Sequence, residues 1–385
     1  MPRLKRRLFS SGYGATGNRI AAPLNGQDAD LQQCKPRQLP IHFEQDIFFF
    51  IPGNKALKIL AGDIGGTNTR LAVFATRGRV LEPLVAQIYS SRRHTSLQDI
   101  LRLFLDTHKP DFQGAAFGIA GPVRDGVGRV TNLPWKIKRG QLAREIGIPQ
   151  VWLLNDLEAN AWGLNALDSR DLYTLNPGRK NARGNRSIIS AGTGLGEAGL
   201  FWNGKQHQPF ASEGGHSDFS PASEIEIALL QYLRQRYDHV SWELVVSGMG
   251  LINIHDFLCV YRREKIPRWL LEAMLGGDAA VAISRAAQEK KCPVCTEALA
   301  LFVRLYGREA GNHALKIMAT GGVYIGGGIA PKILEQLQDK TFLEAFFAKG
   351  SMEALMRDMP VTVVLNENTA LYGSALYAEA RMNQQ

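Results

Sequence analysis

The stretch Ala61-Gly-Asp-Ile-Gly-Gly-Thr-Asn-Thr-Arg70 lies between two apolar runs and indicates an α/β fold. Strands are expected at Ile59–Ala61 and at Arg70–Phe74, with a tight turn at Gly65-Gly66 between them. The turn is not a Walker loop, because no Lys-Ser/Thr pair follows it and the next element is a strand rather than a helix. We therefore expect a β-hairpin whose glycines let a ligand approach the backbone.

The chemistry of this hairpin suits phosphate. The backbone N–H groups of a glycine turn, together with the side chains of Thr67 and Asn68, can face phosphate oxygens. Asp63, just before the turn, could hold a magnesium ion through water. A plain hairpin with a glycine turn accounts for the same residues, so this motif alone leaves both interpretations open.

Two further glycine clusters follow. Ser190-Ala-Gly-Thr-Gly-Leu-Gly196 lies between expected strands at Ser187–Ser190 and Gly199–Trp202, so strand, glycine turn and strand occur twice, as if the chain had two related halves. Two such hairpins facing each other would clamp phosphates across a cleft. In the third cluster, Thr320-Gly-Gly-Val-Tyr-Ile-Gly-Gly-Gly-Ile-Ala-Pro331, bare glycines leave room for a base and a ribose, and Pro331 is a favoured helix start.

From Lys58 onward, short apolar runs alternate with longer helical patterns, which is typical of α/β proteins. Further strands are expected at Gly114–Gly118, Trp152–Leu154, Lys316–Ala319 and Val361–Leu365. Helices are expected at Ser96–Thr107, Leu157–Leu167, Ser223–Tyr237, Gly277–Glu289, Thr296–Ala314, Pro331–Leu337 and Thr369–Met382.

Composition excludes other classes of protein. With 45% hydrophobic and 21% charged residues, the 385-residue chain can build the cores of two domains. No stretch approaches the ~18 consecutive apolar residues of a membrane span, so we expect no membrane partner. The net charge is +9, but residues 1–58 carry +5 of it, and the remaining +4 leaves no long basic stripe for nucleic acid. Residues 1–57 lack sustained periodicity, and we expect a disordered N-terminal extension with some transit-peptide character.

The cysteines indicate a reducing compartment. Cys34, Cys259, Cys292 and Cys295 are too scattered for a disulfide framework, which favours the cytoplasm. Cys292-Pro-Val-Cys295 is half of a zinc site, and the other cysteines are distant in sequence. We expect two ordinary thiols before a helix and no structural zinc.

Polar residues beside an expected strand are candidates for catalysis. Asp156 follows the apolar Val151–Leu154 and precedes a helix, which places a carboxylate at the C-terminal end of a strand, where α/β proteins bind ligands. A carboxylate in such a position could act as a general base. A helix N-cap aspartate is the alternative interpretation. Asn155 beside it supplies an amide that can donate and accept hydrogen bonds.

A second polar motif lies farther along the chain. In Glu213-Gly-Gly-His216 the glycines permit an unusual backbone path and place a carboxylate near an imidazole. With Asp218 as a third ligand, this pair could instead bind a metal, although no second histidine lies at ligand spacing. Glu243 alone would be taken as a surface residue.

Six motifs, in the same order and at similar intervals, resemble those of bacterial-type glucokinases. They are Asp63-Ile-Gly-Gly-Thr-Asn68, Leu154-Asn-Asp156, Ala191-Gly-Thr-Gly-Leu-Gly196, Glu213-Gly-Gly-His216, Ser247-Gly-Met-Gly250 and the Gly321–Gly328 cluster. The match runs from about Lys58 to about Ala380. Single glycine motifs are common to the actin-like ATPase and hexokinase superfamily, whereas six in order, with sugar-site carboxylates between them, are specific.

The resemblance implies an α/β, actin-like (ribonuclease H-like), two-lobed sugar kinase with its active site in the cleft between the lobes. The small lobe would span residues 58–165, the large lobe 166–365, and the last helix, in 366–385, would return to the small lobe. The implied reaction is ATP-dependent phosphorylation of D-glucose at the 6-hydroxyl, with Mg²⁺, in a cytoplasmic homodimer. A kinase for another hexose or amino sugar, or a sugar-sensing regulator, is the alternative.

The resemblance also assigns roles to residues. Asp156 would be the base, with Asp63 holding magnesium through water. The sugar would be bound by Asn155, Asp156, Glu213, His216, Glu243 and, as a weaker candidate, Asn132. The nucleotide would be bound by Asp63, Gly65, Gly66, Thr67, Asn68, Gly192, Thr193, Gly194, Gly321, Gly322, Gly327 and Gly328.

Overall fold

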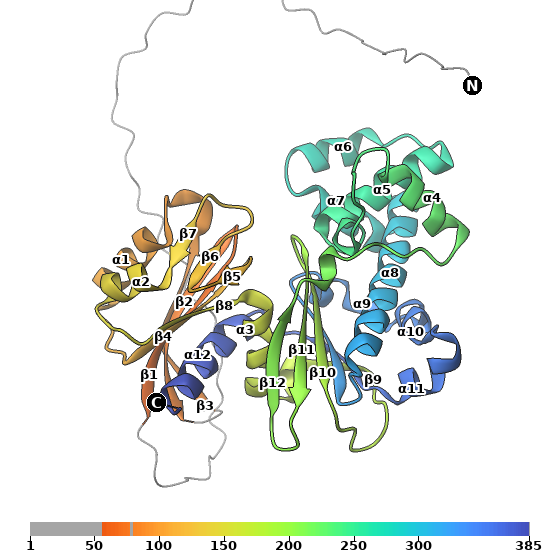
Figure 1. Ribbon diagram of the computed structural model, residues 1–385. Helices are drawn as coiled ribbons and strands as arrows, with labels where there is room; N and C mark the ends of the chain where they lie inside the picture. Colours follow the sequence, from red (N-terminus) through yellow and green to blue (C-terminus); the bar gives the residue numbers. More distant parts are fainter. Residues whose placement is uncertain (1–55, 78–79, 385) are drawn as a thin grey trace, which may run out of the picture. The chain divides into compact units, whose positions relative to one another are not determined.

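The computed structural model describes residues 56–77 and 80–384, which form two mixed β-sheets with helices (Figure 1). The first sheet has the strand order β3 (Val80–Ser90), β2 (Asn68–Arg77), β1 (Leu57–Ile64), β4 (Gly114–Ile119) and β8 (Val151–Asn155). The second has the order β12 (His207–Ser212), β11 (Leu195–Trp202), β10 (Arg186–Ala191), β13 (Gly322–Gly326), β14 (Val361–Val364) and β9 (Leu172–Asn176). A small third sheet contains β5 (Val123–Arg124), β6 (Val127–Arg129) and β7 (Lys136–Lys138).

The two large sheets repeat one pattern of strand pairing. β3, β2 and β1 are antiparallel neighbours, and β4 and β8 then continue the sheet in parallel. In the same way β12, β11 and β10 are antiparallel, and β13 and β14 continue in parallel. The repeated strand, glycine turn and strand in the sequence therefore reflects two related halves, as expected.

The last parallel strand of each sheet leads into a helix, and these two helices pack together. β8 leads into α3 (Asp156–Gly163), and β14 leads into α12 (Thr369–Met382). Figure 1 shows α3 and α12 side by side, and α12 packs on β1 and β4 of the first sheet. A Cβ on Gly163 would overlap the Thr369 carbonyl oxygen, and one on Gly373 would overlap the Ala159 carbonyl oxygen. The close crossing of the two helices therefore requires glycine at both positions.

The remaining helices cover the sheets. Next to the first sheet lie α1 (Leu97–His108) and α2 (Arg139–Ile146). The helices of the second half are α4 (Glu224–Leu233), α5 (Gly248–Arg262), α6 (Arg268–Leu275), α7 (Ala279–Gln288), α8 (Pro293–Ile317), α9 (Leu334–Gln338), α10 (Lys340–Phe347) and α11 (Glu353–Asp358). The 25-residue α8 is the central helix of the larger core, where Phe302 and Tyr306 are fully buried.

The structure corrects three expected elements. The strand expected at Lys316–Ala319 is wrong, because α8 runs to Ile317 and ends at Met318 with a left-handed φ of 51°, and the strand begins only at Gly322. The helix expected at Leu157–Leu167 ends as an α-helix at Gly163 and continues as a 3₁₀ turn. Pro331 lies in a 3₁₀ helix, Ala330–Ile333, that precedes α9. The extension expected at residues 1–57 lies, apart from its last two residues, outside the described residues.

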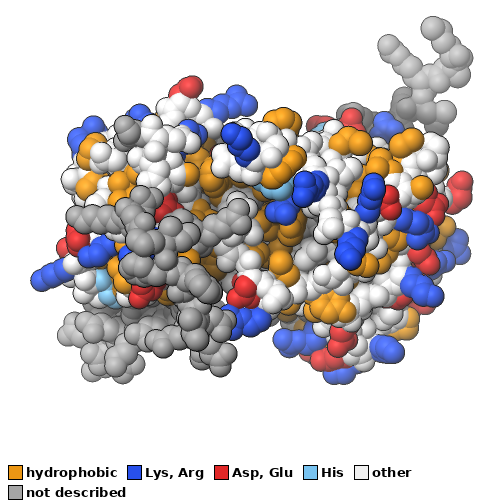
Figure 2. Space-filling model, turned by 90° about the horizontal axis from the view of Figure 1, so that it is seen from below, with side chains coloured by type: hydrophobic (Ala, Val, Ile, Leu, Met, Phe, Trp, Pro, Cys, Tyr) orange, Lys and Arg blue, Asp and Glu red, His pale blue; other side chains and the backbone are white. Residues whose placement is uncertain are grey.

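No helix among the described residues is both long and apolar enough to cross a membrane. Figure 2 shows one face of the molecule, on which Lys and Arg side chains are interspersed with Asp and Glu. On that face the basic side chains do not form one continuous band.

Candidate active site

Asp156 is the first residue of α3, directly after β8. The cap of this helix is Asn155, whose Oδ1 accepts hydrogen bonds from the N–H groups of Leu157 at 2.8 Å and Glu158 at 3.4 Å. Its Nδ2 donates to the Gly121 carbonyl at 3.3 Å. The N-cap interpretation of Asp156 is therefore wrong, because its neighbour performs that function. The Asn155 amide oxygen, expected to serve a sugar hydroxyl, is committed to the helix.

The surroundings of Asp156 make its carboxylate basic. Burial raises its pKa to about 7, and the negative charge of Asp63 adds to this effect, with a smaller contribution from Glu213. Backbone N–H groups at the helix start act in the opposite direction. Asp63, Asp156 and Glu213 are thus brought close enough to interact, although they come from β1, α3 and the loop after β12. A carboxylate with a pKa near neutrality is suited to accept a proton.

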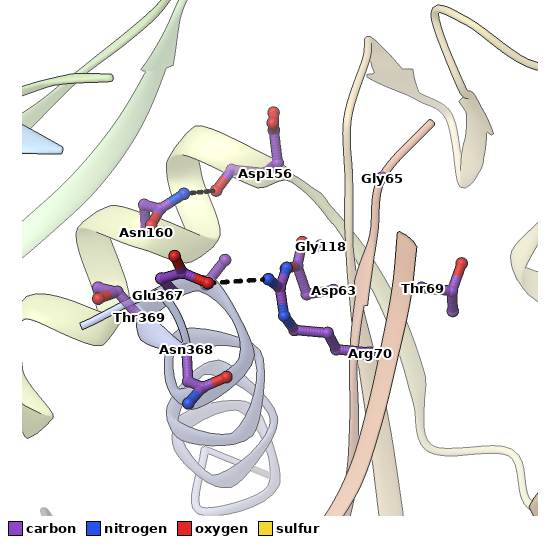
Figure 3. A network of polar contacts seen from close by, with 12 residues as sticks. Asp63, Gly65, Thr69, Arg70, Gly118, Asp156, Asn160, Glu367, Asn368 and Thr369 are labelled. Atoms are coloured by element: carbon purple, nitrogen blue, oxygen red, sulfur yellow. Dashed lines mark hydrogen bonds and ion pairs between the residues drawn. The ribbon is translucent and has the colours of Figure 1, made fainter. Parts of the chain in front are cut away.

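Asp63 is held by an arginine that the sequence analysis did not identify. Arg70, its antiparallel partner across β1 and β2, donates from Nη1 to Asp63 Oδ2 at 3.1 Å. Its Nη2 lies 3.5 Å from Glu367, in the segment before α12 (Figure 3). Burial raises the pKa of Asp63, and Arg70 opposes that rise. The pairing of Asp63 with Arg70 depends on strand register, which the sequence pattern alone does not fix.

The first glycine hairpin is held by hydrogen bonds at Gly65 and is exposed at its turn. Gly65 N–H closes the turn onto the Asn68 carbonyl at 3.0 Å, while Ser91 donates from Oγ to the Gly65 carbonyl at 2.7 Å. Thr67 and Asn68 are exposed. A Cβ on Gly66 would stand 3.0 Å from the Cβ of Asn132, so Asn132 packs beside this turn. The hairpin expected from the sequence is confirmed.

Hydrogen bonds join the second glycine hairpin to Gly248 and Glu243 in the same half of the chain. Gly192 N–H closes the turn onto the Gly194 carbonyl at 2.8 Å, and Gly248 N–H, at the start of α5, donates to the Gly192 carbonyl at 2.8 Å. The Leu195 N–H donates to Glu243 Oε2 at 3.0 Å. Thr193 at the tip is exposed, and a Cβ on Gly192 would meet no neighbouring atom. The turn has space for a ligand.

The structure separates the four glycines of the third cluster that the resemblance assigns to the nucleotide site. Gly327 lies at the C-terminal end of β13 with a φ of 82°, and a Cβ there would overlap the backbone of Ala191, next to the second hairpin. Gly321 and Gly322 lie at the opposite end of this five-residue strand, where Gly321 N–H donates to the Asn185 carbonyl at 2.8 Å. Because β13 begins six residues later than expected, only Gly327 and Gly328 are placed beside the hairpin, and the assignment of Gly321 and Gly322 to one nucleotide site is corrected.

The loop Glu213–His216 contains a 3₁₀ turn, Gly214–His216, on which Glu213 and His216 are exposed. His216 Nδ1 lies 4.0 Å from Glu243 Oε1, so Glu243 connects this loop with the second hairpin. Asp218 instead pairs with His239 Nε2 at 2.9 Å. The alternative metal site of Glu213, His216 and Asp218 is therefore not formed.

A magnesium ion carried by ATP fits one position. Among residues 56–77 and 80–384 no three His, Cys, Asp or Glu side chains are grouped to hold a metal by themselves. Mg²⁺ needs less, because one or two carboxylates and the phosphates of a nucleotide suffice. Asp63 supplies one such carboxylate, near the negative charge of Asp156, with its Oδ2 already paired to Arg70.

Cys292 caps α8 through its Sγ, which accepts from Cys295 N–H at 3.4 Å, and both thiols are buried. Burial raises the pKa of Cys295, which makes this thiol unreactive.

Comparison with known proteins agrees with this arrangement. The glucokinase family model matches residues 60–381. The chain is 40% identical to the glucokinase of Nostoc punctiforme over 335 residues, which cover 83% of this chain and 98% of that protein.

The chain belongs to the glucokinase family.

A more distant relative and two solved structures agree with this assignment of family and fold. The glucokinase of Saccharophagus degradans is 32% identical over 324 residues, covering 83% of this chain and 98% of that protein. A crystal structure of glucokinase from an Antarctic psychrotroph superposes with a TM-score of 0.73 at 30% identity, covering 85% of this chain and all of that one. A ROK family glucokinase from Streptomyces griseus, in complex with glucose and AMPPNP, superposes with a TM-score of 0.60 at 19% identity, covering 84% and 99%. The fold is the two-lobed actin-like fold of these kinases.

Proposed function

We propose that this chain transfers the γ-phosphoryl group of ATP to the 6-hydroxyl of D-glucose, with Asp156 as the base. The observation that carries this proposal is the position of Asp156, a carboxylate of pKa about 7 at the start of α3, free of capping duty and beside both Asp63 and Glu213. Family membership supports the reaction, and the glycine hairpins at Gly65–Asn68 and Gly192–Gly194 support a nucleotide site.

Each side chain has a separate task in this proposal. Asp156 accepts the hydroxyl proton as the hydroxyl attacks in line. The rest of phosphoryl transfer depends on positioning and charge neutralisation. Glu213, His216 and Glu243 bind ring hydroxyls, with Asn132 and the remaining N–H of Asn155 at the edge of the site. Asp63 would hold Mg²⁺, which neutralises phosphate charge when it is bound. Gly327 packs against the backbone of Ala191, and Gly328, where a Cβ would meet no neighbouring atom, leaves space for the nucleotide beside the second hairpin.

The test is turnover with a panel of sugars. ADP release should be measured with glucose, galactose, mannose and N-acetylglucosamine, and the product from glucose should be identified as glucose 6-phosphate. A site whose polar groups are committed to particular hydroxyls rejects an inverted or missing hydroxyl by up to ~10⁴-fold. Glucose should therefore have by far the highest kcat/KM. Comparable kcat/KM values for glucose and galactose would contradict the assignment and favour a broader sugar kinase.

The pairing of two copies and a cytoplasmic location remain predictions. Light scattering of the purified protein across a concentration series tests the dimer, and a mass of one chain throughout the series would contradict it.

A further inference from the structure

A buried cluster of two glutamates and a histidine lies next to the loop Glu213–His216, the sugar loop. Glu197 on β11 is 1% exposed, while Glu309 and His313 on α8 are 0% and 2% exposed. His313 Nδ1 lies 3.2 Å from Glu197 Oε2, and its Nε2 lies 3.1 Å from the Ala198 carbonyl oxygen. The carboxyl of Glu309 lies near that of Glu197, and Glu197 Oε1 and Glu309 Oε1 have no hydrogen-bond partner among the described residues.

The geometry of the cluster requires bound protons. The Ala198 carbonyl can only accept, so His313 Nε2 carries a hydrogen. The contact between His313 Nδ1 and Glu197 Oε2 then joins two acceptors unless one of them is protonated. The negative charge of the neighbouring Glu309 carboxylate also favours a proton on Glu197. Full burial favours the neutral form of Glu197 over the charged one.

The electrostatic surroundings agree with this proton count. Burial, together with the adjacent Glu309, raises the pKa of Glu197 to about 8, and Lys316 opposes this rise. Burial lowers the pKa of His313. The charged groups facing the cluster are Lys316 on α8, with Nζ 3.7 Å from Glu309 Oε1, and Lys349 after α10, which acts on Glu309. The Lys316 side chain is 56% exposed, so water screens most of its charge.

The sugar loop rests directly on this carboxyl. A Cβ on Gly214 would overlap Glu197 Oε2, and a Cβ on Gly215 would overlap the Leu195 carbonyl oxygen of the same strand. Gly214 N–H donates to Ser212 Oγ at 3.0 Å, which fixes the entry to the loop. The two glycines of Glu213-Gly-Gly-His216 are thus needed for contact with β11. Glu213 and His216, which flank these glycines, are both sugar ligands in the proposed function.

We propose that Glu197 is a positioning residue for the sugar site, a buried carboxylic acid that fixes the loop Glu213–His216 while its proton is held at His313 Nδ1 and favoured by the adjacent Glu309. This inference rests on the proposed function for the identity of the sugar. Loss of the proton at high pH places a negative charge on Glu197, next to Gly214. Gly214 lies in the same loop as the Glu213 carboxylate. The loop then moves away from β11, and sugar affinity falls while the base, Asp156, is unaffected.

The decisive experiment compares the wild-type protein with Glu197→Gln between pH 6.5 and 9.5. Glutamine keeps the shape of the side chain and can donate to His313 Nδ1, but it cannot ionise. The dissociation constant of glucose, measured by titration without nucleotide, should rise in the wild type by up to about tenfold per pH unit above the pKa of Glu197. In Glu197→Gln it should stay constant. The same rise in both proteins, or constancy in both, would overturn the proposal.

Two further arms keep the outcome interpretable. Glu309→Gln removes the charge that raises the pKa of Glu197, so the loss of affinity should begin at lower pH than in the wild type. This variant replaces the first if Glu197→Gln does not fold. Glu226→Gln is the matched control, because Glu226 is equally buried but pairs with Arg308 at 3.3 Å, and its pH profile should follow the wild type.

A readout without sugar separates this inference from the proposed function. Hydrogen exchange of the peptide spanning Ser212–Ser217, corrected for the intrinsic effect of pH, should accelerate between pH 7 and 9 in the wild type and not in Glu197→Gln. If glucose does not bind the wild type at pH 7 but this difference is present, the proposed substrate is wrong and the role of Glu197 stands. If exchange is the same in both proteins, the role of Glu197 is refuted.

Discussion

The two glycine hairpins share one backbone design but place their acidic residues differently. Each joins two antiparallel strands and has a parallel strand on its other side. Asp63, before the first turn, is half-buried, pairs with Arg70 and interacts with Asp156. Glu197, after the second turn, is fully buried and contacts the His313 ring. The glycine-turn backbone is therefore repeated, whereas in our proposal one acid serves the reacting centre and the other supports the loop Glu213–His216.

The largest effect is expected from a substitution of Asp156, the proposed base in the first half of the chain. Asp156→Asn keeps the size of the side chain and removes its basicity, so kcat should fall by ~10²–10⁴-fold, the usual contribution of a positioned base. Glucose affinity should change much less. Steady-state kinetics and glucose titration on one preparation measure both, and a near-normal kcat would exclude Asp156 as the base.

The same variant makes a prediction about stability. The pKa of Asp156 is raised in the folded protein, so the folded state binds the proton more tightly than the unfolded one, and stability falls as pH rises from about 4 to about 7. Asp156→Asn lacks this penalty. Its melting temperature should exceed that of the wild type at pH 8, with the gap closing toward pH 4. An equal or lower melting temperature at pH 8 would contradict the raised pKa.

A smaller effect is expected at Arg70. Arg70→Met removes the group that holds Asp63 in place and favours its ionised form, and kcat/KM for Mg·ATP should fall about 10–100-fold, as for other residues that orient a metal ligand. The control is Glu367→Gln, which breaks only the long contact to Arg70 at 3.5 Å from an exposed carboxylate. If both variants lose activity equally, Arg70 acts through Glu367 rather than through Asp63.

The crossing of α3 and α12, the corresponding helices of the two halves, should respond to added volume. Gly373→Ala forces a methyl group against the Ala159 carbonyl and should lower the free energy of unfolding by about 1–3 kcal/mol. Gly140→Ala in α2 is the control, because its Cβ meets no neighbour, and it should be neutral or stabilise by up to about 1 kcal/mol. Denaturant unfolding measures both, and equal effects would show that the crossing tolerates the methyl group.

The smallest effect is expected from removing the residues before Gly53, which precede both halves in the sequence. All proposed site residues lie between Asp63 and Gly328, so a chain that begins at Gly53 should keep kcat and KM within about twofold, the usual effect of a change remote from the chemistry. Loss of most of the rate in a folded, shortened protein would show that the preceding residues complete the site or a dimer.

Local sequence signals predicted the hairpins and the final helix, because a glycine turn between apolar runs and an uninterrupted helical pattern are decided within a few residues. Thr369–Met382 matches α12. The contacts of Asp63 with Arg70, Glu197 with His313 and Gly214 with Glu197 could not be predicted in the same way. They depend on strand register and on which face of β11 meets α8, which are set by packing between segments distant in sequence.

The central assignment, Asp156 as the base, is tested most directly by the pH dependence of kcat/KM for glucose between pH 5 and 8, in the wild type and in Asp156→Asn. If Asp156 is the base, the wild-type value falls about tenfold per pH unit below the pKa of this group, which is about 7 in the ligand-free protein. The residual activity of the variant is then independent of pH over the same range. The same acidic decline in both proteins, or none in the wild type, would contradict the assignment of Asp156 as the base.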